Sequence, residues 1–262
     1  MSALRVSLDP RDAAGHRTVL AGLPGRFVVA GHGPAEVTVV CGRDPGWPDD
    51  VARAVRDGAS GVLLTRPELV AADRVRALAA TVAGRAAVAV DTPFANDRTW
   101  TEFREEIAAD ASRASIVDSM VSTVDGDLAA ALVDQLATVA GLVNLAGLRL
   151  VHRTAAGYLA TAGLGGPVVT LAGVTANPGL AIDVVAADRR WHVRFDGTAP
   201  AMPTEVTLHD RTGAHTRPLI HESGHRAAWE RLYQAVTGTG TVGWSLDSLA
   251  DTLAIAGTLV NH

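Results

Sequence analysis

Short apolar runs alternate with amphipathic segments through the first third of this 262-residue chain. The amphipathic segments predict helices at Gly15–Leu23, Pro48–Asp57 and Glu68–Ala83, with Gly58 as a C-terminal cap of the second. Strands that alternate with helices are typical of βαβ units and a mostly parallel sheet. The apolar runs predict strands at Leu4–Leu8, Arg26–Ala30, Glu36–Cys41, Gly61–Leu64 and Ala86–Val90.

The link between the second and third of these strands is short. Only Gly31–Ala35 separate them, whereas a parallel crossover needs about a dozen residues or more. Either a crossover helix has been deleted or the two strands pair antiparallel. Both alternatives describe a trimmed Rossmann-like domain, which we assign to residues 1–98.

From about Trp100 the pattern becomes β-rich, and hairpin turns at Asp196-Gly197 and Arg211–Gly213 separate several of the runs. We expect residues 99–262 to form an α+β domain, an open-faced mixed or antiparallel sheet with helices on one face. Whether the C-terminal helices pack back on the first domain is left open. The helices are predicted at Trp100–Ala111, Leu128–Val143, Arg226–Val236 and Leu246–Leu259, and the strands at Ser115–Thr123, Val168–Val174, Ala181–Ala187, Trp191–Phe195, Glu205–His209 and His215–Ile220.

Composition excludes several classes of protein. The formal net charge is −5 and acidic and basic residues are interleaved, so no basic stripe marks a nucleic-acid surface. Cys41 is the single cysteine, which excludes an internal disulfide and a cysteine metal cluster. No apolar run approaches the ~20 residues of a membrane helix. We therefore expect a cytoplasmic protein without nucleic-acid or membrane partners.

Two segments carry a family resemblance. The closing stretch Gly224–Val260, with Ala-Val-Thr-Gly and then Trp-Ser-Leu-Asp-Ser, resembles the last two helices of Gfo/Idh/MocA-type oxidoreductases. The order of strand, Thr65-Arg66-Pro67, helix and strand also resembles that family. The resemblance implies a Rossmann domain, an open-sheet domain and a lysine that helps proton and hydride transfer. Here Arg66 stands in the lysine's place, and arginine stays protonated near neutral pH.

Other positions that the resemblance makes functional are also altered. The loop Asp9–Gly15 keeps one glycine of the family's Gly-x-Gly-x-x-Gly pattern, and Gly31-His32 replaces the acidic residue that holds ribose hydroxyls. Gly42–Trp47 replaces a Thr-Pro-Pro-x-x-His turn, and Ala130 and Asp134 lie where Asp and His are frequent. We therefore expect no cofactor, NAD or NADP being bound only if this interpretation of the loop is wrong.

Five polar residues occupy family-like positions that would bring them to a pocket, where we expect a small polar metabolite to bind. Arg66 would hold a carboxylate, phosphate or oxyanion, and Asp134 or His152 would handle the proton. No residue is predicted to bind a metal. The candidate catalytic residues are Arg66, Asp91, Arg98, Asp134 and His152.

Two alternatives stay open. His221-Glu222-x-x-His225 has the spacing of a zinc hydrolase motif, but Pro218 and Gly224 predict that the helix begins near Ser223. A non-catalytic scaffold or regulatory subunit, pairing with itself or with an intact relative through the open sheet, is the main alternative to an enzyme. The sheet is expected to expose apolar surface, because one helical layer should not cover all of its apolar residues. These residues are Val169, Leu171, Ile182, Val184, Trp191, Val193, Val206 and Leu208.

Overall fold

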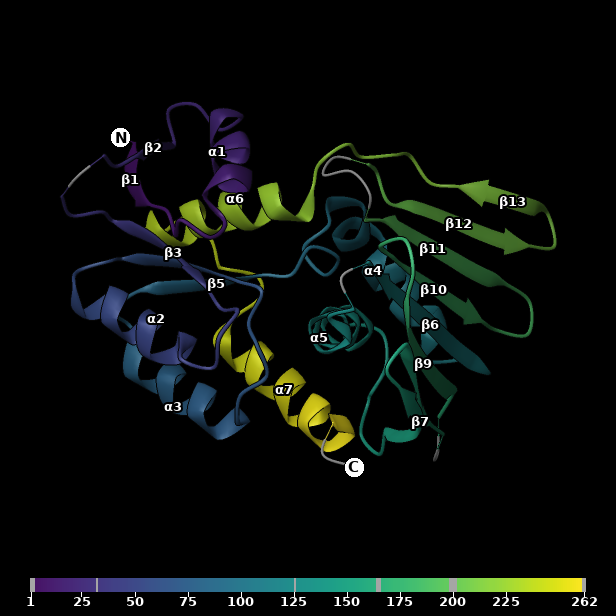
Figure 1. Cartoon of the computed structure of the whole chain (residues 1–262). Coiled ribbons are helices and arrows are strands. Elements are labelled where there is room, and N and C mark those ends of the chain that lie inside the picture. The colour runs from purple at the N-terminus through teal and green to yellow at the C-terminus, as the bar shows by residue number, and fades with distance from the viewer. Residues whose placement is uncertain (1–2, 32, 125, 164–165, 198–201, 261–262) are drawn as a thin grey trace. The chain divides into compact units, whose positions relative to one another are not determined.

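The computed structural model describes residues 3–31, 33–124, 126–163, 166–197 and 202–260. The chain divides into two compact units (Figure 1). Unit 1 contains residues 1–92 and 225–251, and unit 2 contains residues 93–224 and 252–262. Each unit therefore takes segments from both halves of the chain. In the described residues no helix is long and apolar enough to cross a membrane.

Unit 1 is built on a five-stranded parallel sheet in the order β2-β1-β3-β4-β5. Helices α1 and α6 lie on one face, and α2 and α3 are on the other (Figure 1). The strands are β1 (Leu4–Ser7), β2 (Phe27–Val29), β3 (Val37–Cys41), β4 (Gly61–Thr65) and β5 (Ala87–Asp91), and the helices are α1 (Ala13–Ala21), α2 (Trp47–Arg56), α3 (Ala72–Val82) and α6 (Gly224–Val236).

The short link resolves the question left open by the sequence. Both β2 and β3 run parallel to β1 and pair with its two sides, so they are not neighbours. The link of seven residues, 30–36, carries the chain past β1, and its described positions, 30–31 and 33–36, contain no helix. Strands lie about 4.8 Å apart, so this segment has to cross about 10 Å, which seven extended residues can span. The Rossmann-like sheet is trimmed at this crossover.

The core of unit 1 depends on a helix from the far end of the sequence. Trp229 and Leu232 of α6 are fully buried against Val6 of β1 and Leu63 of β4. Phe27 packs edge-on to Trp229, with ring centroids 5.0 Å apart. Because these contacts cover one sheet face, α6 is part of the first unit's core despite its position in the sequence.

Unit 2 contains an eight-stranded mixed sheet in the order β13-β12-β11-β10-β6-β9-β8-β7, in which only β6 and β9 pair in parallel among the described strands. Helices α4 (Arg98–Ala111) and α5 (Leu128–Val139) pack on one face of this sheet (Figure 1). The last helix, α7 (Leu246–Val260), belongs to unit 1 up to Asp251 and to unit 2 beyond it. The strands are β6 (Ile116–Thr123), β7 (Arg149–Thr154), β8 (Gly157–Ala162), β9 (Val168–Thr175), β10 (Gly179–Val185), β11 (Arg190–Asp196), β12 (Glu205–Asp210) and β13 (Gly213–Thr216).

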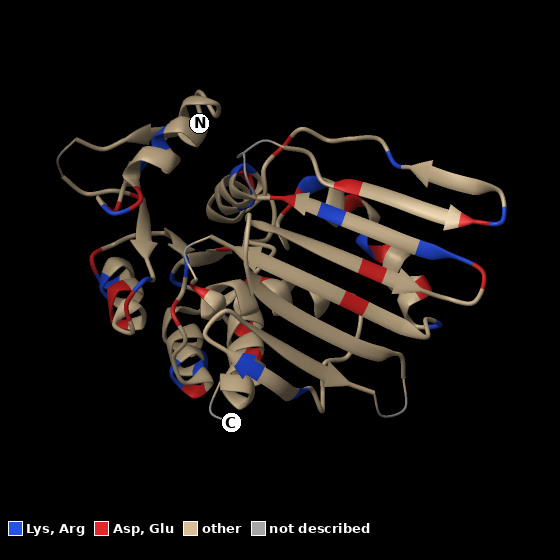
Figure 2. Ribbon diagram, turned by 45° about the vertical axis from the view of Figure 1, so that its right-hand side comes forward, with Lys and Arg blue, Asp and Glu red and all other residues tan. Residues whose placement is uncertain are grey.

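The prediction that the apolar strand residues of unit 2 leave an exposed apolar surface is wrong for the eight residues named. All eight side chains named above share one face, as their alternation predicts, but every one of them is buried. They pack beneath the helical layer rather than facing solvent. The opposite face mixes charged and uncharged residues, and Figure 2 shows acidic and basic segments on its strands between long uncharged stretches.

Candidate active site

The carboxyl ends of parallel strands are where doubly wound sheets bind ligands. In unit 1, the loops after β1, β3, β4 and β5 meet at this edge, and titratable side chains gather there. These side chains form two groups: the β1–α1 loop with its arginine, and a buried pair of histidines next to β5.

Arg11 organises the β1–α1 loop. Its guanidinium donates to Asp9 over 2.7 and 3.0 Å, to Asp44 over 2.9 Å and to the carbonyl of Cys41 over 3.1 Å. Asp9 also accepts the backbone N–H of Arg11 and that of Cys41. The bonds from Arg11 lower the pKa of Asp9 to about 2, although burial opposes this shift. A cation with forked donors thus occupies the loop that precedes α1.

The N-terminus of α1 has no side-chain cap. Asp12 stands at the capping position, but its carboxylate accepts a 2.8 Å bond from the hydroxyl of Thr65, at the end of β4. A helix N-terminus with uncapped N–H groups and a neighbouring guanidinium is a donor set that suits a diphosphate. Asp9 and Asp44 oppose an anion, because the single positive charge of Arg11 offsets only one of their two negative charges. The donors fit the diphosphate of a dinucleotide only if Arg11 exchanges a carboxylate for a phosphate.

A buried aspartate–histidine pair lies at the end of β5. Asp91 Oδ2 bonds to Nδ1 of His225, the second residue of α6, and both side chains are largely buried, with 11% and 23% exposed. Burial acts to lower the pKa of His225, but the charge and the hydrogen bond of Asp91, together with the charge of Asp12, raise that pKa above its ordinary value. Oδ1 of Asp91 is buried and has no hydrogen-bond partner in the described part of the chain.

A second histidine contacts this pair. His16 of α1 lies with its ring centroid 4.7 Å from that of His225, and its Nδ1 is 3.3 Å from Nε1 of Trp229. Since the indole can only donate, this nitrogen of His16 is an acceptor. Burial, and then the charge of His225, lower the pKa of His16 to about 4. The two histidines therefore differ in charge near neutral pH, one neutral and the other held toward its protonated form.

The loop that carries Arg66 is fixed by Gly42. The N–H of Gly42 donates to Thr65 O over 2.7 Å, and its carbonyl accepts from Glu68 N over 2.7 Å. A Cβ at Gly42 would lie 2.8 Å from the Cα of Pro67, so the approach requires glycine. Arg66 itself is exposed and has a left-handed backbone with φ 47°. Arg66, which the resemblance places at the position of a lysine, is thus held by its backbone at the sheet edge.

The five candidate residues are divided between the two units. Arg66 and Asp91 lie in unit 1. In unit 2, Arg98 is exposed at the first position of α4, Asp134 is half-buried within α5, and His152 is exposed on β7. Asp91 is bonded to a residue that was not among the five, His225.

The zinc-like motif is interrupted by the start of a helix. α6 begins at Gly224, so His221 and Glu222 precede it and do not share a helical face with His225. Among the described residues, no group of three or more His, Cys, Asp or Glu side chains could hold a metal ion. His32, considered above at the end of β2, lies outside the described residues.

Comparison with known proteins identifies the fold. No protein-family model matches the sequence, and no curated protein matches it. Solved structures do match over almost the whole chain. UDP-N-acetylglucosamine 3-dehydrogenase GnnA from Acidithiobacillus ferrooxidans has a TM-score of 0.72 at 15% identity and covers 100% of this chain and 98% of its own. The chain has the Gfo/Idh/MocA-type oxidoreductase fold.

Two further structures of this fold make the same point. A 3-ketoreductase from Actinomadura kijaniata, in complex with NADP and TDP-benzene, matches with a TM-score of 0.75 at 14% identity, over 99% of this chain and 98% of its own. A dehydrogenase from Chromobacterium violaceum matches with a TM-score of 0.69 at 13% identity, over 100% and 95%. The expectation that no cofactor binds is contradicted by the NADP complex on the same fold. That expectation rested on the missing glycines and on the carboxylates of Asp9 and Asp12, and it did not consider the N–H donors of Arg11 and of the start of α1.

Sequence reasoning missed His225 as the partner of Asp91, and His16 as the ring that packs against His225. A signal was present, because His225 is the last residue of the zinc-like motif and Asp91 directly follows the predicted strand Ala86–Val90. Their pairing depends on α6 packing against the first sheet, a contact across 134 positions that no local pattern reveals.

Proposed function

We propose that the protein is a dinucleotide-dependent oxidoreductase that oxidises a hydroxyl, or reduces a ketone, of a small polar metabolite of the sugar type. The observation that carries the proposal is the Asp91–His225 pair at the carboxyl edge of the parallel sheet. The sugar-type substrate rests on the matched UDP-N-acetylglucosamine 3-dehydrogenase, and the ketone as the reduced group rests on the matched 3-ketoreductase.

In this proposal His225 replaces the missing lysine. Asp91 holds Nδ1–H of the imidazole and leaves Nε2 to exchange a proton with the substrate oxygen, as in other Asp–His pairs. In the oxidation, the alcohol proton passes to Nε2 and the carboxylate of Asp91 stabilises the imidazolium that forms. In the reduction, Nε2 returns that proton to the oxygen. Neutral His16 and the indole of Trp229 keep the ring in place.

The dinucleotide, when bound, accepts or supplies the hydride. Arg11 and the N-terminus of α1 would hold its diphosphate, for the reasons given above. Arg66 would contact an anionic group or oxygen at the same edge, since its guanidinium is exposed and always charged. It does not exchange protons, which is the reason for assigning that step to His225.

NADPH binding tests the role of Arg11, and substrate turnover tests the role of His225. NADPH titrated into the protein should bind with a micromolar dissociation constant, and Arg11→Ala should weaken it about tenfold or more, the loss of a charge-assisted contact. The matched control is Arg17→Ala, an exposed arginine on α1, the helix that follows the loop of Arg11. Equal NADPH affinity of both variants would show that Arg11 does not hold the diphosphate.

For turnover, NADP reduction is followed with UDP-N-acetylglucosamine as the probe substrate. His225→Gln should lower kcat by about 10²-fold or more while leaving NADPH affinity unchanged. It should also remove the low-pH limb of the rate profile. Full activity in His225→Gln would show that another group carries the proton.

We also propose self-association through the open face of the unit 2 sheet, which serves the enzyme and the scaffold alternative equally. Ile116 and Met120 of β6 and Val168 of β9 lie on this face with 41%, 49% and 48% of their surface exposed, and Ile116 is paired directly with Val168. Apolar side chains in the middle of a sheet favour a partner. Light scattering should show a dimer that Met120→Glu dissociates, whereas Val124→Glu, at an exposed loop valine, should leave it intact.

A further inference from the structure

The helix-free crossover leaves part of the unit 1 sheet uncovered. Val6 faces α1 and α6, so its neighbours on β1 face the other way, and Ser7 is exposed. On β2, Val28 is 51% exposed. A crossover helix between β2 and β3 would lie over this surface, and residues 30–36 are too few to form one.

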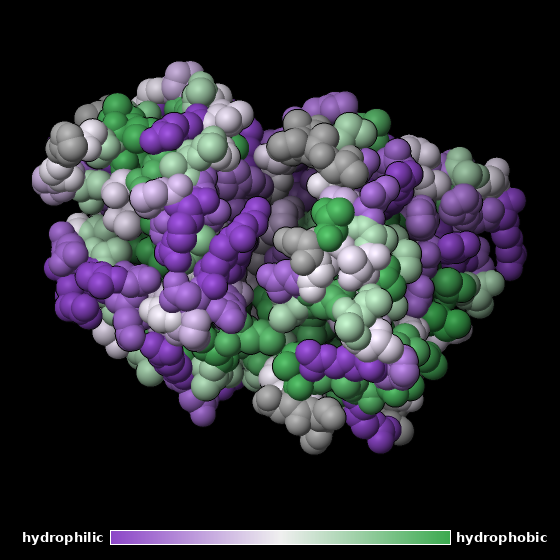
Figure 3. Space-filling view, viewed as in Figure 1, coloured by the Kyte–Doolittle hydropathy of each residue, from purple (hydrophilic) through white to green (hydrophobic). Residues whose placement is uncertain are grey.

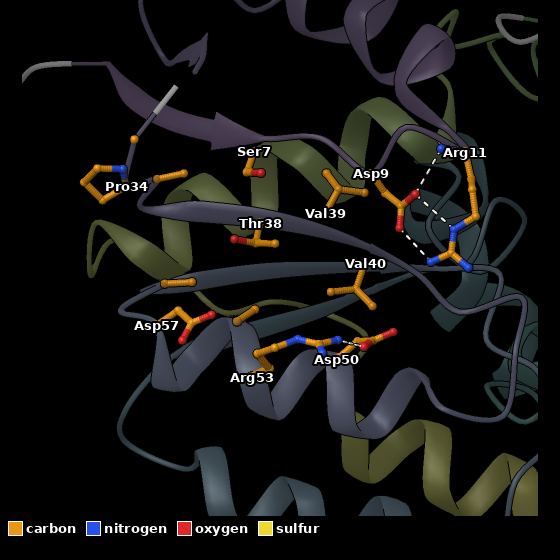
Figure 4. Close-up of a pocket in the computed structure, with 14 residues that line it drawn as sticks. Ser7, Asp9, Arg11, Pro34, Thr38, Val39, Val40, Asp50, Arg53 and Asp57 are labelled. Carbon is orange, nitrogen blue, oxygen red and sulfur yellow. Dashed lines mark hydrogen bonds and ion pairs between the residues drawn. The ribbon is translucent and has the colours of Figure 1, made fainter. Parts of the chain in front are cut away.

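A cavity of about 480 Å³ occupies the uncovered region. It is bounded by β1 and β3, by α2 and by the Gly33–Ala35 part of the crossover (Figure 4). Its volume falls within the range of small-molecule sites. On the face shown in Figure 3, unit 1 is largely hydrophilic around α2, in keeping with a cavity for a polar ligand.

The polar groups of this cavity are only partly used within the protein. The hydroxyls of Ser7 and Thr38 and the carboxylate of Asp57, at the end of α2, make no hydrogen bond or ion pair among the described residues. Arg53 pairs with Asp50 one turn earlier on the same helix and keeps further N–H donors. Val40 supplies an apolar floor beside them.

This set suits neighbouring hydroxyl groups on a ring. A carboxylate accepts from two adjacent hydroxyls, and serine and threonine hydroxyls donate or accept as the ligand requires. A phosphate is disfavoured, because Asp9, Asp50 and Asp57 outnumber Arg11 and Arg53 around the cavity. An apolar ligand is disfavoured, because it would strand the free hydroxyls and the carboxylate.

We propose that this cavity binds the vicinal diol of a sugar ring, either the ribose of a nucleoside or a free pyranose, with Asp57 as the main acceptor and Ser7 and Thr38 beside it. The three residues assigned to the diol lie on β1, on β3 and at the end of α2, although the lining of the cavity also includes Asp9 and Arg11 of the β1–α1 loop. The diol site uses neither Arg11 nor the Asp91–His225 pair, so it goes beyond the proposed oxidoreductase chemistry and does not require it.

The test uses the full chain and three probes: adenosine, 2′-deoxyadenosine and glucose. Ligand-observed NMR and calorimetry should show binding of adenosine, glucose or both, with dissociation constants of about 1 mM or tighter. 2′-Deoxyadenosine lacks the diol and should bind about tenfold more weakly than adenosine. Adenosine alone identifies a nucleoside as the source of the ring, and glucose alone identifies a free sugar.

Variants connect the binding to the cavity. Asp57→Asn and the pair Ser7→Ala, Thr38→Val should each weaken the bound probe about tenfold or more. Asp73→Asn, at an exposed aspartate of α3, is the matched control and should change nothing. Equal binding of adenosine and 2′-deoxyadenosine, unchanged binding in Asp57→Asn, or no binding of any probe would each overturn the proposal.

The outcome is independent of the dinucleotide proposal. NADPH binding that depends on Arg11 but not on Asp57, with no binding of adenosine or glucose, would refute the diol site alone. Probe binding that depends on Asp57, without NADPH binding, would refute the dinucleotide proposal alone.

Discussion

Buried His16 predicts that acid destabilises unit 1 in a defined pH range. Its pKa is lowered from 6.5 to about 4, chiefly by burial and also by the charge of His225, and its side chain is only 2% exposed. As the pH falls below 6.5, the unfolded chain takes up a proton that the folded chain excludes until about pH 4. Stability that depends on neutral His16 is therefore present above 6.5 and lost on acidification.

The magnitude follows from the two pKa values. Each unit of difference corresponds to about 1.4 kcal/mol, and over the interval from about pH 7 to about pH 5 the linkage relation gives a loss of about 2 kcal/mol. His225 acts in the opposite direction. Its raised pKa contributes stability that is complete below the unfolded value and is lost as the pH rises, so it offsets part of the wild-type slope.

The perturbation is His16→Gln, which removes the titrating group and keeps an acceptor for Trp229. Urea unfolding followed by tryptophan fluorescence at both pH values should show that the wild type loses about 2 kcal/mol more than the variant. His209→Gln, at an exposed histidine on β12, is the control and should keep the wild-type slope. Parallel slopes for wild type and His16→Gln would refute the burial argument.

Three substitutions and one control test the local geometry by urea unfolding. Gly42→Ala should cost about 1–3 kcal/mol, since its Cβ would meet Pro67 at 2.8 Å, whereas Gly15→Ala, with open space around its Cβ, should be neutral or stabilising. Tyr158→Phe should cost about 1–2 kcal/mol, because it removes the 2.7 Å bond to the buried Gln135 Oε1; a cost near zero would mean that water satisfies the amide. Arg66→Gly should not destabilise the fold, because φ of 47° suits glycine, and a large loss would show that the arginine side chain itself holds the loop.

Local patterns predicted much of the fold because the signals are local. Gly58, with φ of 100°, follows α2 as its cap, as expected from sequence. Strands β7 and β8 were missed. Residues Arg149–Thr154 are polar and almost wholly exposed, so no apolar alternation marks them. Their place is set by pairing with β9 through β8, which is tertiary information.

The candidate site was predicted less well than the fold. Asp91 could be selected because it ends a strand, but its partner His225 is distant in sequence. Arg11 appeared as an ordinary charged loop residue, and the missing glycines outweighed it. Its guanidinium suggests a hydrogen-bond donor to an anion only when the uncapped start of α1 is seen to follow the same loop.

The order in which the chain is synthesised gives the position of α6 a further meaning. Ribosomes release the N-terminus first, and all five strands of unit 1 precede α6 by more than a hundred residues. Until Trp229 and Leu232 emerge, Val6, Leu63 and their neighbours have no α6 to cover them. Such long-range closure is slow and leaves apolar strands open to wrong partners. A nascent chain stopped before α6 should therefore be a better chaperone client than the completed protein.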